Sequence, residues 1–83
     1  MDKKHKLKTE LDNDYWLLVA RVAKNIRRVR ITKDLTQEDL HSLGFERRWY
    51  QRIESGTYSV SLPTLDRIAR AFEVDISEFF KKN

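Results

Sequence analysis

The chain has two glycines, at positions 44 and 56, and each follows a short stretch with helical patterning. Glycine tolerates the left-handed backbone conformation that commonly ends a helix, so each glycine is a predicted stop. The sequence therefore predicts two short helices, 37–43 and 46–55, joined by a tight turn. One proline is present and β-branched alternation is scarce, which favours an all-helical fold.

Three further helices are predicted around this pair. The first runs from Asp14 to Thr32, because its apolar residues recur at helical spacing. Ser61 is a predicted N-cap of the fourth helix, and Asp75 caps a short fifth helix over residues 76–82. The apolar stripe of the first helix is Tyr15, Val19, Val22, Ile26 and Val29. The buried side of the fourth helix is predicted to be Leu62, Leu65, Ile68, Ala69 and Phe72.

A chain of 83 residues is long enough for one domain. We expect that domain to be residues 14–83, preceded by a flexible basic arm, or a frayed helix start, over residues 1–13. The chain has no cysteine, which excludes disulfides and Cys-ligated zinc. Its polar N-terminus has no signal-peptide core, and no apolar run approaches the ~20 residues of a membrane helix. These features predict a soluble, cytoplasmic protein that does not contact membranes.

Basic residues are clustered rather than evenly spread, and the net charge is +4. The segment between Asp14 and Asp34 has no acidic residue, and a second basic cluster follows in the predicted third helix. Such clustering favours a polyanionic partner, although a solvated helix face is the alternative interpretation. The basic residues are Arg21, Lys24, Arg27, Arg28, Arg30 and Lys33 in the first cluster, and Arg47, Arg48 and Arg52 in the second.

The second predicted helix begins at a capping signal. Thr36 can accept a free backbone N–H, and Asp39, three residues later, is a weaker version of the usual Glu of a capping box. Two short helices joined through a glycine are the arrangement expected of a helix-turn-helix.

An ordered series of short matches over residues 22–80 resembles the Cro/CI-type (XRE family) helix-turn-helix domains of bacterial and phage repressors. The resemblance implies a five-helix, lambda-repressor-like domain with an extended first helix. By size, the chain is similar to restriction–modification controller proteins and stand-alone repressors. The matching residues are Ile26, Arg27, Arg30, the segment 35–40, the segment 43–45, Tyr50, the segment 52–56, Ser61, Leu62, Thr64, Leu65, Ile68, Ala69, Ala71, Phe72 and Val74.

The chain departs from the family pattern in three places. It has one residue fewer than usual between Leu40 and Gly44. Asp34 replaces a glycine, and it tolerates a positive φ moderately well. The loop 57–59 lacks the basic residues often found there, which predicts fewer charged phosphate contacts from this side.

The resemblance implies that the third helix enters the major groove and reads base edges. The implied base-reading residues are Arg47, Arg48, Gln51 and Arg52. Glu46 is expected to cap this helix and orient Arg47, and accepting a hydrogen bond from cytosine is the alternative. The implied phosphate-contacting residues are Thr36, Gln37, Trp49, Thr57, Tyr58 and Ser59. For Trp49, covering the shortened turn is an equally good interpretation.

The resemblance also implies a homodimer that binds an inverted repeat with half-sites ~34 Å apart. The candidate dimer contacts are Trp16, Leu17, Phe79 and Phe80. One of the two phenylalanines is expected to fill the core beneath the fourth helix, and the other to form a dimer contact with Leu11, Trp16 or Leu17.

The rival functions are an enzyme and a protein-interaction module. The two histidines, His5 and His41, have no catalytic partner in the sequence, and no glycine-rich phosphate loop is present. We therefore expect no catalysis, no cofactor and no metal. An antitoxin or adaptor with the same fold, bound to a protein partner, remains open.

Overall fold

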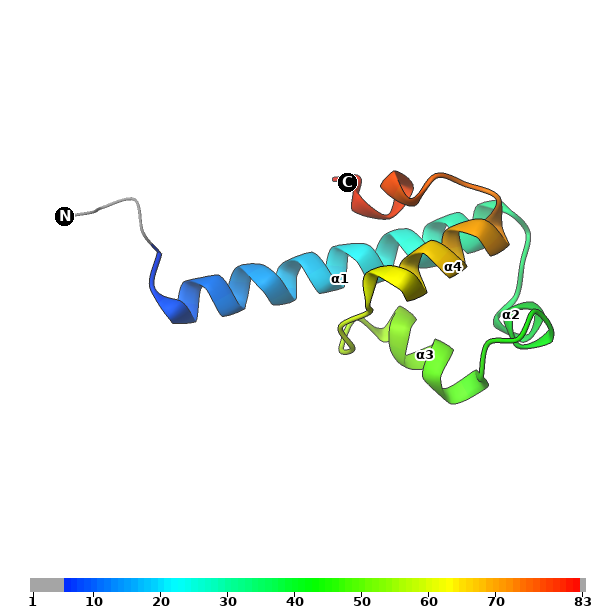
Figure 1. The fold of residues 1–83 in the computed structure, drawn as a ribbon, viewed down its shortest axis with the longest axis horizontal. Coiled ribbons are helices and arrows are strands. Elements are labelled where there is room, and N and C mark those ends of the chain that lie inside the picture. The colour runs from blue at the N-terminus through cyan, green and yellow to red at the C-terminus, as the bar shows by residue number, and fades with distance from the viewer. Residues whose placement is uncertain (1–5, 83) are drawn as a thin grey trace.

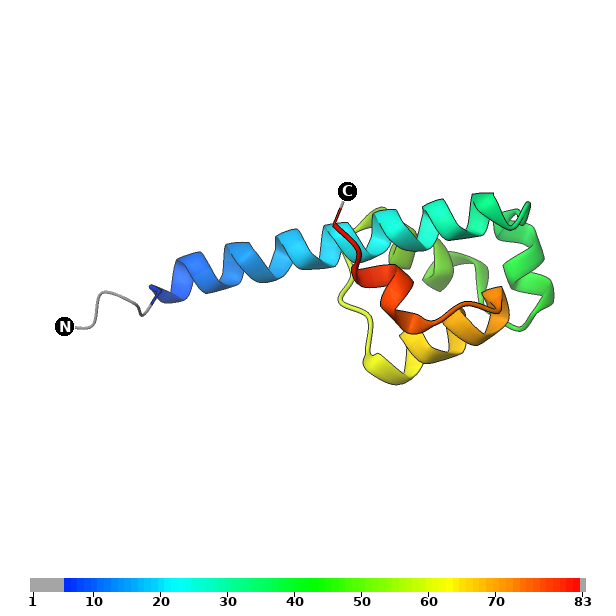
Figure 2. The ribbon, with the colours of Figure 1, turned by 90° about the horizontal axis from the view of Figure 1, so that it is seen from above.

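The long helix α1, Lys8–Thr32, is the axis of the molecule, and the other elements pack around its second half (Figures 1 and 2). The structure is a computed structural model that describes residues 6–82. In this range it contains helices and no strands, as the sequence predicts. The remaining elements are α2 (Gln37–Ser42), α3 (Arg47–Ser55), α4 (Leu62–Phe72) and the 3₁₀ helix η1 (Ile76–Phe80).

The helix α1 begins at Lys8, earlier than the predicted start at Asp14. Its first turn is held by Glu10, whose carboxylate accepts a hydrogen bond from the backbone N–H of Leu7 at 2.9 Å. The ion pair between Lys6 and Asp14 adds a second contact over these turns. The predicted flexible arm is therefore helical from Lys8 onward, and its residues 1–5 lie outside the described residues.

One core joins all five elements. The buried residues of α1 begin at Val19, and the half-buried Leu18 packs against the core. The predicted stripes of α1 and α4 are buried, apart from Tyr15 and Leu62, whose side chains are 44% and 66% exposed. Leu62 lies in the first turn of α4, and its predicted burial is wrong. The core cluster consists of Val22, Ile26, Val29, Leu40, Phe45, Tyr50, Ile53, Leu65, Ile68, Ala69, Phe72 and Phe79.

The turns that separate the short helices use positive φ angles. Gly44 has φ 103° and Gly56 has φ 79°, which confirms both predicted stops. A Cβ on Gly56 would lie 3.5 Å from the Cα of Ala20, so α3 ends close against α1. Asp34, with φ 60°, holds the conformation for which the family uses glycine.

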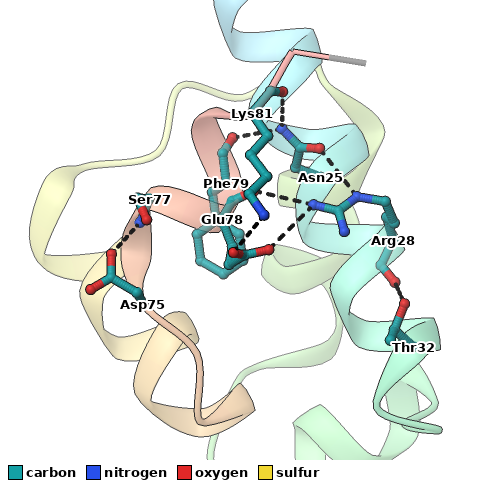
Figure 3. Close-up of polar contacts among 8 residues, drawn as sticks. All are labelled: Asn25, Arg28, Thr32, Asp75, Ser77, Glu78, Phe79 and Lys81. Carbon is teal, nitrogen blue, oxygen red and sulfur yellow. Dashed lines mark hydrogen bonds and ion pairs between the residues drawn. The ribbon is translucent and has the colours of Figure 1, made fainter.

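The C-terminal element is shorter and tighter than the predicted fifth α-helix. Asp75 caps it by accepting the N–H of Ser77 at 2.8 Å, as predicted, and the 3₁₀ turn ends at Phe80. Asn25 anchors it to α1, donating to the carbonyls of Phe79 and Lys81 at 3.0 and 2.8 Å (Figure 3).

Phe79 is fully buried and meets Phe72 edge to face, with the ring centroids 6.1 Å apart. Phe79 therefore fills the core, and its candidacy as a dimer contact is wrong. Phe80 is 40% exposed and keeps that candidacy.

Candidate nucleic-acid interface

The helix α3 is buried along one side and carries basic residues along the other. Tyr50 and Ile53 anchor it in the core, with exposed fractions of 1% and 0%. Glu46 caps its start as predicted, accepting the N–H groups of Arg48 and Trp49 at 3.1 and 2.8 Å. The side chains on the outer side are exposed and are the predicted base-reading residues Arg47, Arg48, Gln51 and Arg52.

Three of these four side chains have no hydrogen-bond or ion-pair partner in the part of the chain that the structure describes. Arg48, Gln51 and Arg52 form no side-chain hydrogen bond or ion pair with any residue from 6 to 82. Arginine and glutamine have the donor and acceptor patterns that match guanine and adenine in the major groove. These groups are therefore available to a ligand without breaking an existing contact.

Arg47 is held by Glu38 of α2. Its Nε lies 3.0 and 2.8 Å from the two carboxylate oxygens, and Nη2 also contacts Oε1. The hydrogen bond from Arg47 holds the pKa of the Glu38 carboxyl below its ordinary value. The prediction that Glu46 orients Arg47 is therefore wrong: Glu38 does so. The pair is open to solvent, with exposed fractions of 59% and 58%, and exposed pairs exchange partners at small cost.

Trp49 packs against the turn between α2 and α3. Its ring stacks on Phe45 with centroids 6.4 Å apart and an interplanar angle of 18°, and the side chain is half-buried. Arg67 also packs on the Phe45 ring, and its guanidinium carbon lies 4.5 Å from the ring centre. This arrangement favours the interpretation in which Trp49 covers the turn.

The predicted phosphate-contacting residues of α2 are engaged within the protein. Thr36 and Asp39 form the predicted reciprocal cap, with distances of 3.0 and 2.8 Å. Gln37 donates to Glu54 of α3 at 3.2 Å and is half-buried. Thr36 remains exposed, whereas Gln37 must share its amide with Glu54.

A polar hollow of about 230 Å³ lies where α1, α2 and α3 meet. It brings Gln51, a predicted base-reading residue, close to Gln37. The exposed Arg27, which the sequence pattern assigned only to a general basic surface, lines the same hollow. The residues lining the hollow are Arg27, Arg30, Gln37, Gln51, Glu54 and Ser55.

The loop after α3 exposes the other predicted phosphate-contacting side chains, Thr57, Tyr58 and Ser59. The Thr57 hydroxyl lies 2.7 Å from that of Ser55, and Ser59 is hydrogen-bonded to Tyr15 of α1. The loop is thereby held against both α1 and the end of α3.

A buried ion pair fixes α3 to α1, and the sequence analysis missed it. Arg30 contacts both carboxylate oxygens of Glu54, at 2.7 and 3.1 Å, and donates to the carbonyl of Leu35 at 2.7 Å. Burial works to raise the pKa of Glu54, but hydrogen bonds from Arg30 and Gln37 outweigh it and hold that pKa below its ordinary value. Arg30 therefore does not belong to the solvated basic surface, where the sequence pattern placed it.

The three remaining candidate dimer contacts are exposed. Trp16 and Leu17 lie on the part of α1 that precedes the core, with exposed fractions of 48% and 69%. Phe80 borders a small apolar hollow of about 80 Å³ together with Tyr15 and Leu18. These residues are accessible, which is a requirement for an interface.

Comparison with known protein families decides the nature of this site. The family model described as helix-turn-helix matches residues 26–79, the segment that runs from the last two turns of α1 into η1. The chain belongs to the helix-turn-helix family. No curated protein and no solved structure matches it.

As a helix-turn-helix protein of the XRE type, the chain is a DNA-binding regulator. In this chain α2 precedes α3 across the Gly44 turn. Over the described residues, no helix is long and apolar enough to span a membrane, and no group of side chains is arranged to hold a metal ion.

Proposed function

We propose that this helix-turn-helix protein is a transcriptional regulator that binds an inverted-repeat operator in double-stranded DNA as a homodimer in the cytoplasm. The observation that carries the proposal is the outer side of α3. Guanidinium and carboxamide groups cover that side, while the inner side is anchored in the core by Tyr50 and Ile53. A rigid helix with a row of such groups suits the major groove.

Arg48, Gln51 and Arg52 contact base edges in this proposal. Arginine bonds bidentately to guanine and glutamine to adenine, each pair discriminating by ~1–3 kcal/mol, so the operator includes G·C pairs. Arg47 joins them either by leaving Glu38 or by remaining held in a fixed plane by it. A fixed plane favours bidentate recognition, because the guanidinium loses less conformational entropy on binding.

Phosphate contacts position the helix and carry no sequence information. Thr36, Thr57 and Tyr58 are exposed and are proposed for this role, and Gln37, Ser59 and the edge of Trp49 are reachable after small adjustments. None of these groups is charged, so long-range attraction depends on the basic residues of α1. Binding is therefore expected to weaken steeply as salt concentration rises.

The experiment is selection of bound sites from random duplex DNA, with the mass of the complex measured alongside. The expected outcome is an inverted repeat occupied by two chains. Selection of no sequence, together with capture of a defined partner protein, would instead favour an antitoxin- or adaptor-type interaction module.

Substitutions on α3 then test the reading helix. Arg48→Ala and Arg52→Ala are each expected to weaken binding to the selected site by about tenfold or more, with little effect on unrelated DNA. Arg70→Ala is the matched control, because this α4 arginine is 80% exposed and its substitution removes the same single positive charge as each α3 substitution. Retention of full sequence selectivity by both α3 variants would refute the proposed role of this helix.

A further inference from the structure

The first half of α1 extends beyond the rest of the molecule, as both ribbon views show (Figures 1 and 2). The molecule measures 53 Å along its longest axis and only 23 and 20 Å along the others. No residue of α1 before Val19 is buried. A projecting helix that carries exposed leucines needs a reason to stay helical, because isolated helices of this length are marginal in water.

One face of this helix carries a regular series of side chains. Positions 10, 14, 17, 21 and 24 are separated alternately by four and three residues, so they lie along one stripe. Leu17 is at its centre and is 69% exposed. All members are exposed except Arg21, which is half-buried. The stripe, named here the α1 stripe, consists of Glu10, Asp14, Leu17, Arg21 and Lys24.

The charges of the α1 stripe reverse sign at Leu17. Acidic residues precede it and basic residues follow it, and α1 has no acid after Asp14 and no basic residue between Thr9 and Ala20. The helix dipole favours this order, but its influence is limited to the first and last turns. Arg21 and Lys24 form no ion pair within residues 6–82, and Asp14 pairs only with the exposed Lys6.

We propose that the α1 stripe binds the α1 stripe of a second copy of this chain in antiparallel orientation, with the two Leu17 side chains at the centre. This arrangement places Glu10 opposite Lys24 and Asp14 opposite Arg21, and each pair occurs twice by symmetry. A parallel arrangement would set like charges against each other. Leu7 and Leu11, which are 72% and 54% exposed, lie beside the stripe and add apolar contact.

The C-terminal segment, by contrast, already packs against α1 of its own chain. Asn25 holds its carbonyls, Arg28 contacts Glu78, and Phe79 is in the core (Figure 3). Phe80 remains the exposed aromatic of η1. The inference rests on the proposed homodimer and assigns its interface to α1 rather than to this segment.

The test is sedimentation equilibrium of the full chain without DNA, over a range of concentrations. The wild-type chain is expected to dimerise, and Leu17→Lys to shift the equilibrium to monomer. Leu62→Lys is the matched control, because Leu62 is 66% exposed on α4 and lies away from the stripe. Circular dichroism confirms that each variant is folded.

Charge reversal tests the antiparallel orientation. Glu10→Lys and Lys24→Glu are each expected to weaken dimerisation by about tenfold, since each substitution opposes like charges twice. An equimolar mixture of the two variants is expected to form a heterodimer in which both pairs are restored. This rescue does not occur if the substitutions act only by fraying the helix.

Two results would overturn the inference. One is a wild-type chain that is monomeric at all concentrations, and the other is a dimer unaffected by Leu17→Lys and by both charge reversals. Either result leaves the selection of DNA sites by α3 to be decided separately, because no DNA is present in this measurement. Conversely, failure to select an operator would refute the proposed function while the helix pairing could still be observed.

Discussion

Replacing Arg30 with methionine is predicted to destabilise the protein severely. The substitution keeps an unbranched apolar stem but leaves Glu54 without its cation. The side chains of Arg30 and Glu54 are only 10% and 4% exposed, so solvent cannot replace the lost partner. Removing one member of a buried pair costs ~3–5 kcal/mol, a large part of the ~5–15 kcal/mol of a typical domain. The carbonyl of Leu35 also loses its donor at 2.7 Å.

Thermal unfolding followed by circular dichroism measures this effect. A loss of ~3 kcal/mol lowers Tm by at least ~12 °C in a domain of this size. Arg70→Met is the matched control, because it breaks an exposed pair in which Arg70 lies 2.9 Å from Asp66. That control is expected to cost at most ~0.5 kcal/mol.

The difference between the wild-type chain and Arg30→Met is also predicted to depend on pH. In the wild-type chain the pKa of Glu54 is held below its unfolded value. The stability contributed by the ionised carboxylate is therefore present above the unfolded pKa of about 4.3 and is lost as pH falls through the folded pKa. In the variant the buried Glu54 carboxyl prefers to be neutral. Lowering the pH therefore reduces the difference in the free energy of unfolding between the wild-type chain and Arg30→Met. A cost similar to that of Arg70→Met, or a difference that does not change between pH 7 and 4, would refute this reasoning.

Two further predictions concern α2 and η1. Glu38→Gln is expected to strengthen binding to unrelated duplex DNA, because it removes a negative charge and frees Arg47. It is also expected to narrow the ratio between the dissociation constants for unrelated DNA and for the operator, both measured at one salt concentration. An unchanged ratio would show that Glu38 does not orient Arg47. Asn25→Leu is expected to leave the carbonyls of Phe79 and Lys81 without this donor and to lower the free energy of unfolding by ~1–3 kcal/mol. Hydrogen exchange of the η1 amides is expected to become faster, and amides that still exchange slowly would contradict this anchoring role.

The sequence predicted the helices well where the determining interactions are local. Gly44, Gly56 and the Thr36–Asp39 cap each act on residues within one turn, so their chemistry can be recognised without the fold. The inner side of α3 was likewise visible, since the spacing of Tyr50 and Ile53 is helical. The start of α1 was missed because a projecting helix has no buried stripe to mark it.

The partners of charged side chains were not predictable in the same way. Arg30 and Glu54 are far apart in sequence. The position of Arg30, four residues after Ile26, places it on the buried face of α1, but the helical pattern does not identify the acid that pairs with it. Glu38 lies nine residues before Arg47 in the sequence, and the fold brings the two side chains together. Leu62 was assigned to the core because its spacing fits the stripe, whereas the first turn of α4 extends past the edge of the core.

These pairings explain how α3, the helix proposed to read DNA, can carry a carboxylate. Glu54 lines the same polar hollow as Gln51, and an unpaired negative charge there would repel the phosphates that the surrounding basic residues attract. Arg30 neutralises the Glu54 carboxylate from within the protein, so the positive charge of Arg30 is not available to DNA phosphates. Counting arginines in the sequence therefore overstates the charge offered to DNA. The salt dependence of operator binding should reflect the exposed basic residues, and Arg30→Met should not reduce its slope in chains that remain folded.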